Sequence, residues 1–310
     1  MENTRAKTTR NSLILLLTAT IWGMAFVSQS KGMDYMHPFT FNGVRSLIGA
    51  AGILLYILIS RKIAGGKAAK LDWKLNVKAG LLCGIFLTIA STLQQFGIKY
   101  TSVGKAGFIT TLYIIFVPMF GIFLKKKVAP VVWAAAGMAA VGMYLLCMTE
   151  SLRLGAGDIM VFLCAIAFAI QIMTVDHYAA RIDGAVVSCI QFTVCGVVCC
   201  IGALIWGQPT FGQLQEGMGA LLYAGVLSCG VGYTLQIVGQ KGLNPTVAAL
   251  IMSLESVIAT ISGWIAYKIG FLTTDQTLIA RQIAGCVIVF AAVILVQLPP
   301  EWFRFGKKNA

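Results

Sequence analysis

Residues 92–112 read TLQQFGIKYTSVGKAGFITTL, and residues 234–254 read TLQIVGQKGLNPTVAALIMSL. With a shift of 142 residues, the two stretches carry the same amino acid at eight of 21 positions. Upstream of them, the apolar pattern of the first 60 residues fits a stretch that lies 146 residues later. The matches include three pairs of polar or small residues, namely Gln94/Gln236, Gly97/Gly239 and Lys99/Lys241. The sequence therefore predicts that the chain is an internal duplication.

The composition is that of a chain that lies almost wholly within a membrane. Of 310 residues, 58% are hydrophobic and only 11% are charged, whereas a soluble domain carries about 25% charged residues. A helix needs about 20 apolar residues to cross the hydrocarbon layer. The apolar stretches that meet this length are 12–30, 39–60, 76–98, 103–124, 130–149, 157–176, 184–206, 217–239, 244–268 and 278–298. We therefore predict an all-α polytopic membrane protein with ten transmembrane helices.

The duplication assigns five of these spans to each repeat. Because five is odd, the second repeat must cross the membrane in the opposite sense, which gives two inverted five-helix repeats. The predicted organisation is an N-terminal tail at 1–11, a first repeat at 12–149, a second repeat at 157–298 and a basic C-terminal tail at 299–310. Inverted repeats with a site near the membrane midplane are a recurring plan among transporters.

The positive charge has an explanation that does not involve nucleic acid. The net charge is +13, and with the N-terminus inside, 17 lysines and arginines fall in inside segments against six in outside segments. Cytoplasmic loops carry such an excess in membrane proteins. We interpret these charges as residues that orient the spans, and we predict a protein of the cytoplasmic membrane with both termini in the cytoplasm.

The sequence argues against an enzyme and against a bound metal or cofactor. It contains no HExxH, GxSxG or P-loop motif and no paired carboxylates. Nine cysteines lie in or beside apolar runs without CxxC spacing, and we interpret them as small buried hydrophobes.

One acidic residue, Glu255, lies in the middle of the ninth predicted span. An ionisable side chain at the bilayer centre costs about 2.5–3.5 kcal/mol, so chains keep one where it faces a wet cavity or a partner. At 1.5 Å per residue, Trp22, Tyr113 and Phe168 reach a similar depth. The repeat relates Trp22 to Phe168 and Tyr113 to Glu255, which predicts a central cavity with aromatic walls and one acid. Glu255 is therefore a candidate substrate-binding residue and a candidate proton site, with a structural hydrogen bond as the alternative.

Three further polar residues within spans are predicted to line the same cavity. They are Thr110, Gln171 and Ser253. The two hydroxyl groups could equally donate to carbonyl groups of their own helices.

Four other residues are assigned structural or gating roles. Gln94 and Gln236 are related by the repeat, which favours a shared structural role. Arg45, about 9 Å below the outer interface, is predicted to tie helix ends together, with a substrate carboxylate as the alternative partner. Pro118 is predicted to kink the fourth span, which would suit gating.

Short motifs along the chain carry a family resemblance. They are Ile21-Trp22-Gly23, Phe41 to Arg45, Gly97 to Ser102 and Leu254-Glu255-Ser256-Val257. In this order and spacing they resemble the drug/metabolite transporter superfamily in its ten-helix EamA branch, over nearly the whole chain. The resemblance implies inverted halves, alternating access through a central cavity and cytoplasmic termini. It also implies transport of amino acids, nucleosides, metabolites or toxic compounds, mostly without cofactors.

Two departures from the family pattern concern the coupling mechanism. Ser256 stands where the ninth-span pattern usually has proline. The Gly-Glu pair that often ends the fourth and ninth spans is replaced by Lys125 to Lys127 and by Tyr267-Lys268. The fold that the resemblance implies does not depend on either feature.

We therefore predict a secondary transporter that exports small organic solutes, such as amino acids, nucleosides or amphipathic cations, with proton coupling as an option. The alternatives are a membrane ligand sensor and a lipid flippase. The predicted partners are a small-molecule substrate, the lipid bilayer and protons, and the chain could act as a monomer or a homodimer.

Overall fold

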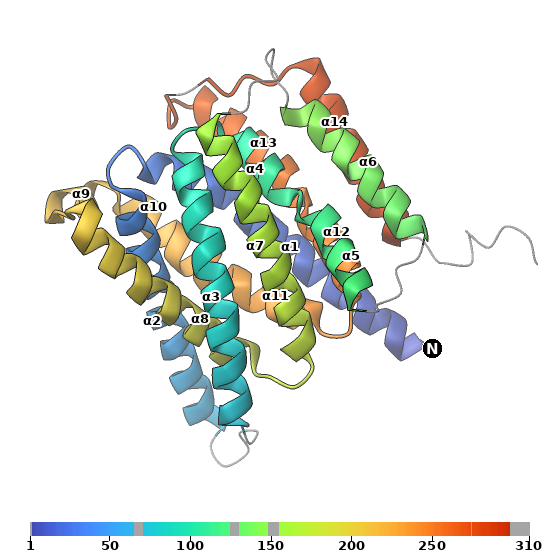
Figure 1. The fold of residues 1–310 in the computed structure, drawn as a ribbon, viewed down its shortest axis with the longest axis horizontal. Coiled ribbons are helices and arrows are strands. Elements are labelled where there is room, and N and C mark those ends of the chain that lie inside the picture. The colour runs from blue at the N-terminus through green and yellow to red at the C-terminus, as the bar shows by residue number, and fades with distance from the viewer. Residues whose placement is uncertain (1, 65–70, 125–129, 148–154, 274, 298–310) are drawn as a thin grey trace, which may run out of the picture.

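The computed structural model describes residues 2–64, 71–124, 130–147, 155–273 and 275–297, which form helices joined by short loops (Figure 1). The helices of the first repeat are α1 (Glu2–Gly32), α2 (Pro38–Ala64), α3 (Trp73–Ile98), α4 (Val103–Thr111), α5 (Tyr113–Phe123) and α6 (Pro130–Cys147). The second repeat begins with α7 (Ala156–Ala179), α8 (Gly184–Gly202), the π-helical turn η2 (Ala203–Gly207), α9 (Phe211–Glu216) and α10 (Met218–Leu222). It continues with the π-helix η3 (Tyr223–Gly232), α11 (Tyr233–Gln240), α12 (Pro245–Met252), α13 (Leu254–Lys268) and α14 (Ala280–Gln297).

These helices confirm the polytopic membrane fold. Among the described residues, eight helical stretches are long and apolar enough to cross a membrane, and two shorter apolar helices lie at 130–142 and 280–295. Each predicted span coincides with one of these ten stretches. Helix α1 extends from Glu2, so it includes most of the predicted N-terminal tail. The predicted C-terminal tail at 299–310 lies outside the described residues.

Local sequence signals start the helices where they were expected. Prolines 38, 130 and 245 open α2, α6 and α12, where the missing N–H group leaves no bond unmade. Asn244 caps α12, because its side-chain oxygen accepts a hydrogen bond of 2.9 Å from the Thr246 amide. Asp72 and Asp183 cap α3 and α8 in the same manner.

The packing of the helices follows the internal duplication. Helix α2 packs along α8, and α6 packs along α14 at one edge of the molecule, so each pair joins equivalent helices of the two repeats (Figure 1). The contact of α3 with α7 has its counterpart in the contact of α11 and η3 with α1. The contact of α13 with α1 likewise corresponds to that of α4 and α5 with α7. The repeats are therefore related by an approximate twofold axis.

The fourth and ninth spans are each broken near the middle of their length. The breaks lie at Leu112, between α4 and α5, and at Ser253, between α12 and α13. These positions correspond in the two repeats to within one residue. The fourth span is thus interrupted six residues before Pro118, and α5 continues through the proline. Because the ninth span breaks without a proline, the break belongs to the repeat rather than to Pro118.

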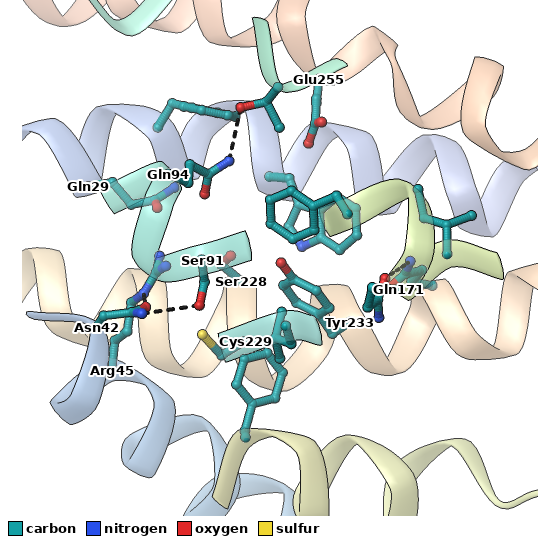
Figure 2. A pocket seen from close by; sticks show the side chains of 18 of the residues that line it. Gln29, Asn42, Arg45, Ser91, Gln94, Gln171, Ser228, Cys229, Tyr233 and Glu255 are labelled. Atoms are coloured by element: carbon teal, nitrogen blue, oxygen red, sulfur yellow. Dashed lines mark hydrogen bonds between the residues drawn. The ribbon is translucent and has the colours of Figure 1, made fainter. Parts of the chain in front are cut away.

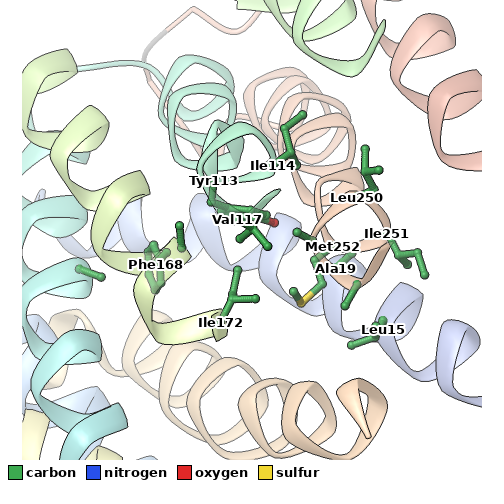
Figure 3. Packing of buried hydrophobic residues seen from close by; sticks show 14 of the residues in the cluster. Leu15, Ala19, Tyr113, Ile114, Val117, Phe168, Ile172, Leu250, Ile251 and Met252 are labelled. Atoms are coloured by element: carbon green, nitrogen blue, oxygen red, sulfur yellow. The ribbon is translucent and has the colours of Figure 1, made fainter. Parts of the chain in front are cut away.

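Buried apolar side chains hold the broken spans against their neighbours (Figure 3). Ile114 and Val117 of α5, Leu250 of α12 and Leu15 of α1 are completely buried in one cluster. This cluster surrounds the ring of Tyr113, so the position of that ring is fixed by packing on several helices.

The eighth span contains a feature that hydropathy did not predict, the π-helix η3. Two of its glycines let neighbouring helices approach closely. A Cβ atom added at Gly225 would lie 2.8 Å from the Cβ atom of Ile48, and one added at Gly232 would lie 2.7 Å from the Trp22 indole nitrogen. Such π-helical segments inside regular helices are frequently found at functional sites.

An ion pair ties the two repeats together at one end of the molecule. The Lys105 ammonium group, at the start of α4, lies 2.6 Å from a carboxylate oxygen of Asp158 in the first turn of α7. Thr101 donates a further hydrogen bond of 2.9 Å to Asp158. The pair therefore links the first repeat to the second directly.

Candidate functional site

A cavity lies in the centre of the helix bundle, and residues of α1, α2, α3, α4, α5, α7, α8, η3, α11 and α13 line it (Figure 2). The volume open to the centre of a water-sized molecule is only about 30 Å³. The cavity in this conformation therefore has room for a few water molecules rather than for an organic solute.

The lining of the cavity obeys the internal repeat. Twelve of its 19 residues form six pairs that are related by the shifts of 142 or 146 residues. The pairs are Trp22/Phe168, Phe26/Ile172, Leu87/Cys229, Ser91/Tyr233, Gln94/Gln236 and Tyr113/Glu255. The cavity therefore lies on the approximate twofold axis, as expected of a site between inverted repeats.

The acidic residue of the cavity is Glu255, which is only 3% exposed. The Tyr113 hydroxyl group donates a hydrogen bond of 3.0 Å to Glu255 Oε1. The two broken spans create this pair, because Tyr113 opens α5 directly after Leu112 and Glu255 follows the break at Ser253. Among the described residues, no lysine, arginine or histidine lies within 4.0 Å of the Glu255 carboxyl group. Its described polar partner is thus a neutral phenol.

The basic residue of the cavity is Arg45, which is 5% exposed and lies on the far side of the cavity from Glu255 (Figure 2). Arg45 Nε donates a hydrogen bond of 3.0 Å to the side-chain oxygen of Asn42, and its guanidinium group lies 5.5 Å from the centre of the Phe41 ring. No described carboxylate lies within ion-pair distance of it. A buried guanidinium group without an acidic partner is costly, so its charge favours an anionic group in the cavity.

Aromatic rings form the wall between these two charged groups. The ring centres of Trp22 and Tyr233 are 4.5 Å apart, and those of Phe192 and Tyr233 are 5.0 Å apart. The buried Trp22 indole nitrogen has no hydrogen-bond partner among the described residues. The wall thus offers both apolar faces and a free donor.

Side-chain amides supply the remaining polar groups. Gln94 donates a hydrogen bond of 3.2 Å to Thr110, and Gln236 donates one of 3.2 Å to Gln171. Within the described residues, the Gln171 amide nitrogen and the oxygens of Gln236 and Gln29 are buried without a partner. Because buried polar atoms are almost always hydrogen-bonded in native proteins, these atoms mark places where a ligand or water can bind.

The structure brings together most of the residues that the sequence singled out. Six of the seven predicted cavity residues line the cavity, and these are Trp22, Thr110, Tyr113, Phe168, Gln171 and Glu255. The seventh, Ser253, does not line it, and its hydroxyl group donates a hydrogen bond of 2.7 Å to the Leu250 carbonyl group. Arg45, Gln94 and Gln236, which were assigned structural roles, line the cavity as well, whereas Pro118 does not.

Sequence reasoning missed several lining residues, among them Asn42, Ser91 and Tyr233. Ser91 and Tyr233 directly precede Thr92 and Thr234, the first matched residues of the repeat. Extending the match by one position would have paired them. Asn42 donates a hydrogen bond of 3.1 Å to Ser91. It lies one helical turn before Arg45, so the helical period places both residues on the same face of α2.

Metal binding receives no support from the described residues. They contain no group of three or more histidine, cysteine, aspartate or glutamate side chains arranged to hold an ion.

Comparison with known proteins gives consistent matches over the whole length. The model of the EamA-like transporter family matches residues 10–148 and again residues 155–298. An uncharacterized transporter of Archaeoglobus fulgidus is 27% identical over 92% of this chain and 84% of its own length. The uncharacterized transporter YwfM of Bacillus subtilis is 26% identical over 91% of this chain and 94% of its own. A crystal structure with 16% sequence identity superposes with a TM-score of 0.73, covering 96% of this chain and 99% of that one, which shows a shared fold.

Proposed function

The chain belongs to the EamA-like transporter family, and from that premise we propose that it moves small organic solutes through the central cavity by alternating access, with Glu255 as its proton-exchanging group. The observation that carries this proposal is the buried hydrogen bond between Tyr113 and Glu255. It joins the two repeats at the point where both broken spans meet the cavity.

The surroundings of Glu255 support a role in which it binds either a proton or a cationic group of the solute. An ionised carboxylate that is buried without a cation is strongly destabilising. Glu255 therefore needs either a proton or a cationic group in the cavity whenever the cavity is closed. A transporter that must satisfy this condition in every closed state couples the movement of its solute to the movement of a proton.

The side chains on the opposite side of the cavity indicate which chemical groups the solute carries. Arg45 offers a fixed positive charge, and the Gln171 amide nitrogen and the Gln236 amide oxygen, which have no partner among the described residues, offer hydrogen bonds. The aromatic wall between the two charged ends suits an apolar body of modest size. A small organic solute that places an anionic group near Arg45 and a cationic group near Glu255 would give each of these charged side chains a partner of opposite charge.

The small volume of the cavity is consistent with a closed conformation. A solute can enter only after the helices move apart, and the breaks at Leu112 and Ser253 provide places where half of a span can move without the other half. We place both termini in the cytoplasm on the basis of the 17 to six distribution of positive charges. Export is the direction that we expect.

The test is a flux measurement in proteoliposomes that contain a pH-sensitive dye. A panel of amino acids, nucleosides and organic cations is added to the wild type, to Glu255→Gln and to Glu216→Gln. Glu216 is an exposed residue of α9, so its replacement makes the same chemical change outside the cavity. We expect proton movement with one class of solute, unchanged in Glu216→Gln and abolished in Glu255→Gln.

Two outcomes would contradict this proposal. If Glu255→Gln transports normally at every pH, the proton role is wrong, although transport itself is upheld. If a labelled solute binds to the protein but shows no counterflow across the proteoliposome membrane, the protein binds without transporting, as a membrane sensor would.

A further inference from the structure

Two adjoining hollows lie on the surface of the helix bundle, away from the central cavity. They are near the end of the bundle that carries most of the lysines and arginines. The first is lined by polar and charged residues, among them Ser60, Arg61, Arg181 and Lys241. The second is an apolar groove between α2 on one side and η3 and α11 on the other, lined by Gly49, Gly52, Ile53, Val226, Val231 and Leu235. The two hollows share three lining residues, which are Tyr56, Thr234 and Val238. A single ligand with a polar end and an apolar end can therefore occupy both.

The polar hollow has an excess of available positive charge. Arg61 and Arg181 each lie over an aromatic ring, at 5.6 Å and 6.0 Å from the ring centre, and neither forms an ion pair with a described residue. Asp72 and Asp183 accept hydrogen bonds from amides in the first turns of α3 and α8, and the hollow holds three basic residues against these two acidic ones. Lys241 donates a hydrogen bond of 3.2 Å to the Ile182 carbonyl group, which brings no negative charge to the hollow. This arrangement favours an anionic head group.

The apolar groove is long enough for an acyl chain. Arg61 and Gly49 are 12 residues apart on α2, which corresponds to about 18 Å along the helix. Half of the hydrocarbon core of a bilayer measures about 15 Å. The groove therefore extends from the head-group level to about the middle of the membrane.

Glycine keeps this groove open. A Cβ atom added at Gly52 would have no heavy atom within 4 Å, so the space beside this residue is unfilled. At Gly49, by contrast, an added Cβ atom would lie 2.7 Å from the Cβ atom of Cys229, so α2 and η3 touch at the deep end of the groove. The groove is thus open beside Gly52 and closed at Gly49, so an acyl chain that enters from the polar end has space past Gly52 and a defined end.

We propose that an anionic phospholipid binds here, with its head group against Arg61, Arg181 and Lys241 and one acyl chain in the groove past Gly52. In the orientation given above, the lipid comes from the cytoplasmic leaflet, where anionic lipids attract basic residues. A second copy of the chain could cover the apolar groove, but it would have to bring an acidic group to the polar hollow at the same time. The lipid satisfies both hollows with one molecule.

The test is native mass spectrometry of the purified full-length protein in detergent, titrated with phosphatidylglycerol or phosphatidylcholine. We expect one phosphatidylglycerol to bind at least about tenfold more tightly than phosphatidylcholine. Each basic residue near an anionic lipid contributes about fivefold, so the double replacement Arg61→Gln, Arg181→Gln should weaken binding about 25-fold. The matched control, Lys62→Gln with Lys74→Gln, removes the same charge at the same end of the spans but outside the hollow, and should bind normally.

A second pair of variants tests the groove independently of the charges. Gly52→Leu should weaken binding by about tenfold, since it keeps roughly two CH₂ groups of the acyl chain out of the groove. Gly137→Leu is the control, because a Cβ atom at Gly137 also meets nothing within 4 Å but lies on α6, away from the groove.

Four outcomes would overturn the proposal. They are equal affinity for both lipids, unchanged binding in the arginine variant, displacement of the lipid by inorganic phosphate alone, and a dimer that Gly52→Leu dissociates without change in lipid binding. The third would mean that the hollow binds a free anion, and the fourth that a second copy covers the groove.

Discussion

The replacement Gly23→Ala tests whether the contact between α1 and α13 positions the cavity. A Cβ atom added at Gly23 would lie 2.6 Å from the Cβ atom of Ile258 and 2.8 Å from the backbone oxygen of Glu255. Carbon atoms in contact lie about 3.5–4.0 Å apart, so the two helices must separate by as much as about 1 Å. Overpacking of this kind costs about 1–3 kcal/mol. A Gly-to-Ala change within a helix returns about 0.5–1 kcal/mol, so the net loss lies between about 0 and 2.5 kcal/mol, with a central value of about 1 kcal/mol.

This loss has two measurable consequences. The unfolding temperature in detergent should fall by roughly 2–6 °C. Solute transport should fall as well, because Trp22 lies next to the substitution and Glu255 is moved by the shift of α13. Tm is measured by the loss of the monodisperse peak on heating, and transport is measured at equal amounts of folded protein.

The matched control is Gly137→Ala, where the added Cβ atom meets nothing within 4 Å. It should leave transport unchanged and keep Tm equal to or above that of the wild type. If Gly23→Ala and Gly137→Ala have the same Tm and the same transport rate, the close approach of α1 and α13 does not position the cavity, and the reasoning fails.

Three more predictions follow from the contacts described above. Tyr113→Phe removes the hydrogen bond to Glu255, and because a hydrogen bond between neutral groups contributes about 0.5–1.5 kcal/mol, we expect transport to fall about twofold to tenfold with no loss of helical circular dichroism; a rate equal to wild type would contradict this. Lys105→Met should lower Tm, since it leaves the buried Asp158 without its cation, and adding Asp158→Asn should restore much of the loss; a double variant less stable than Lys105→Met would refute the pairing. Pro118→Ala should keep transport within about twofold of wild type, because the span is broken six residues earlier; a block in transport would show that the proline itself acts in gating.

The sequence predicted the number and order of the spans because both depend on quantities that can be counted. Length and apolarity mark a span, the odd number of spans per repeat determines the inversion, and residue counting gives depth. Glu255, Tyr113, Trp22 and Phe168 were found by depth and by the repeat, and all four line the cavity.

The facing of the helices could not be predicted in the same way. A span that is apolar all round has no amphipathic stripe, so the sequence does not say which side faces the centre. Ser253 has the right depth but faces its own helix, whereas Arg45 and Tyr233 turn toward the cavity. The sequence did not predict the π-helix η3 for a related reason. Its glycines are needed because neighbouring helices approach closely there, and those contacts are not visible in the sequence.

The ion pair between Lys105 and Asp158 breaks the symmetry of the molecule. The positions related to it by the repeat are Val247 and Ser12, which carry no charge. Two identical halves would have end states of equal free energy, open to one side or to the other. Opening at the end of the ion pair must break it, and each 1.4 kcal/mol of difference shifts the ratio of the two populations about tenfold. The ion pair therefore favours the conformation that is shut at its own end. Moving the charges to the opposite end, by combining Lys105→Val and Asp158→Ser with Val247→Lys and Ser12→Asp, should shift the resting population toward the opposite orientation.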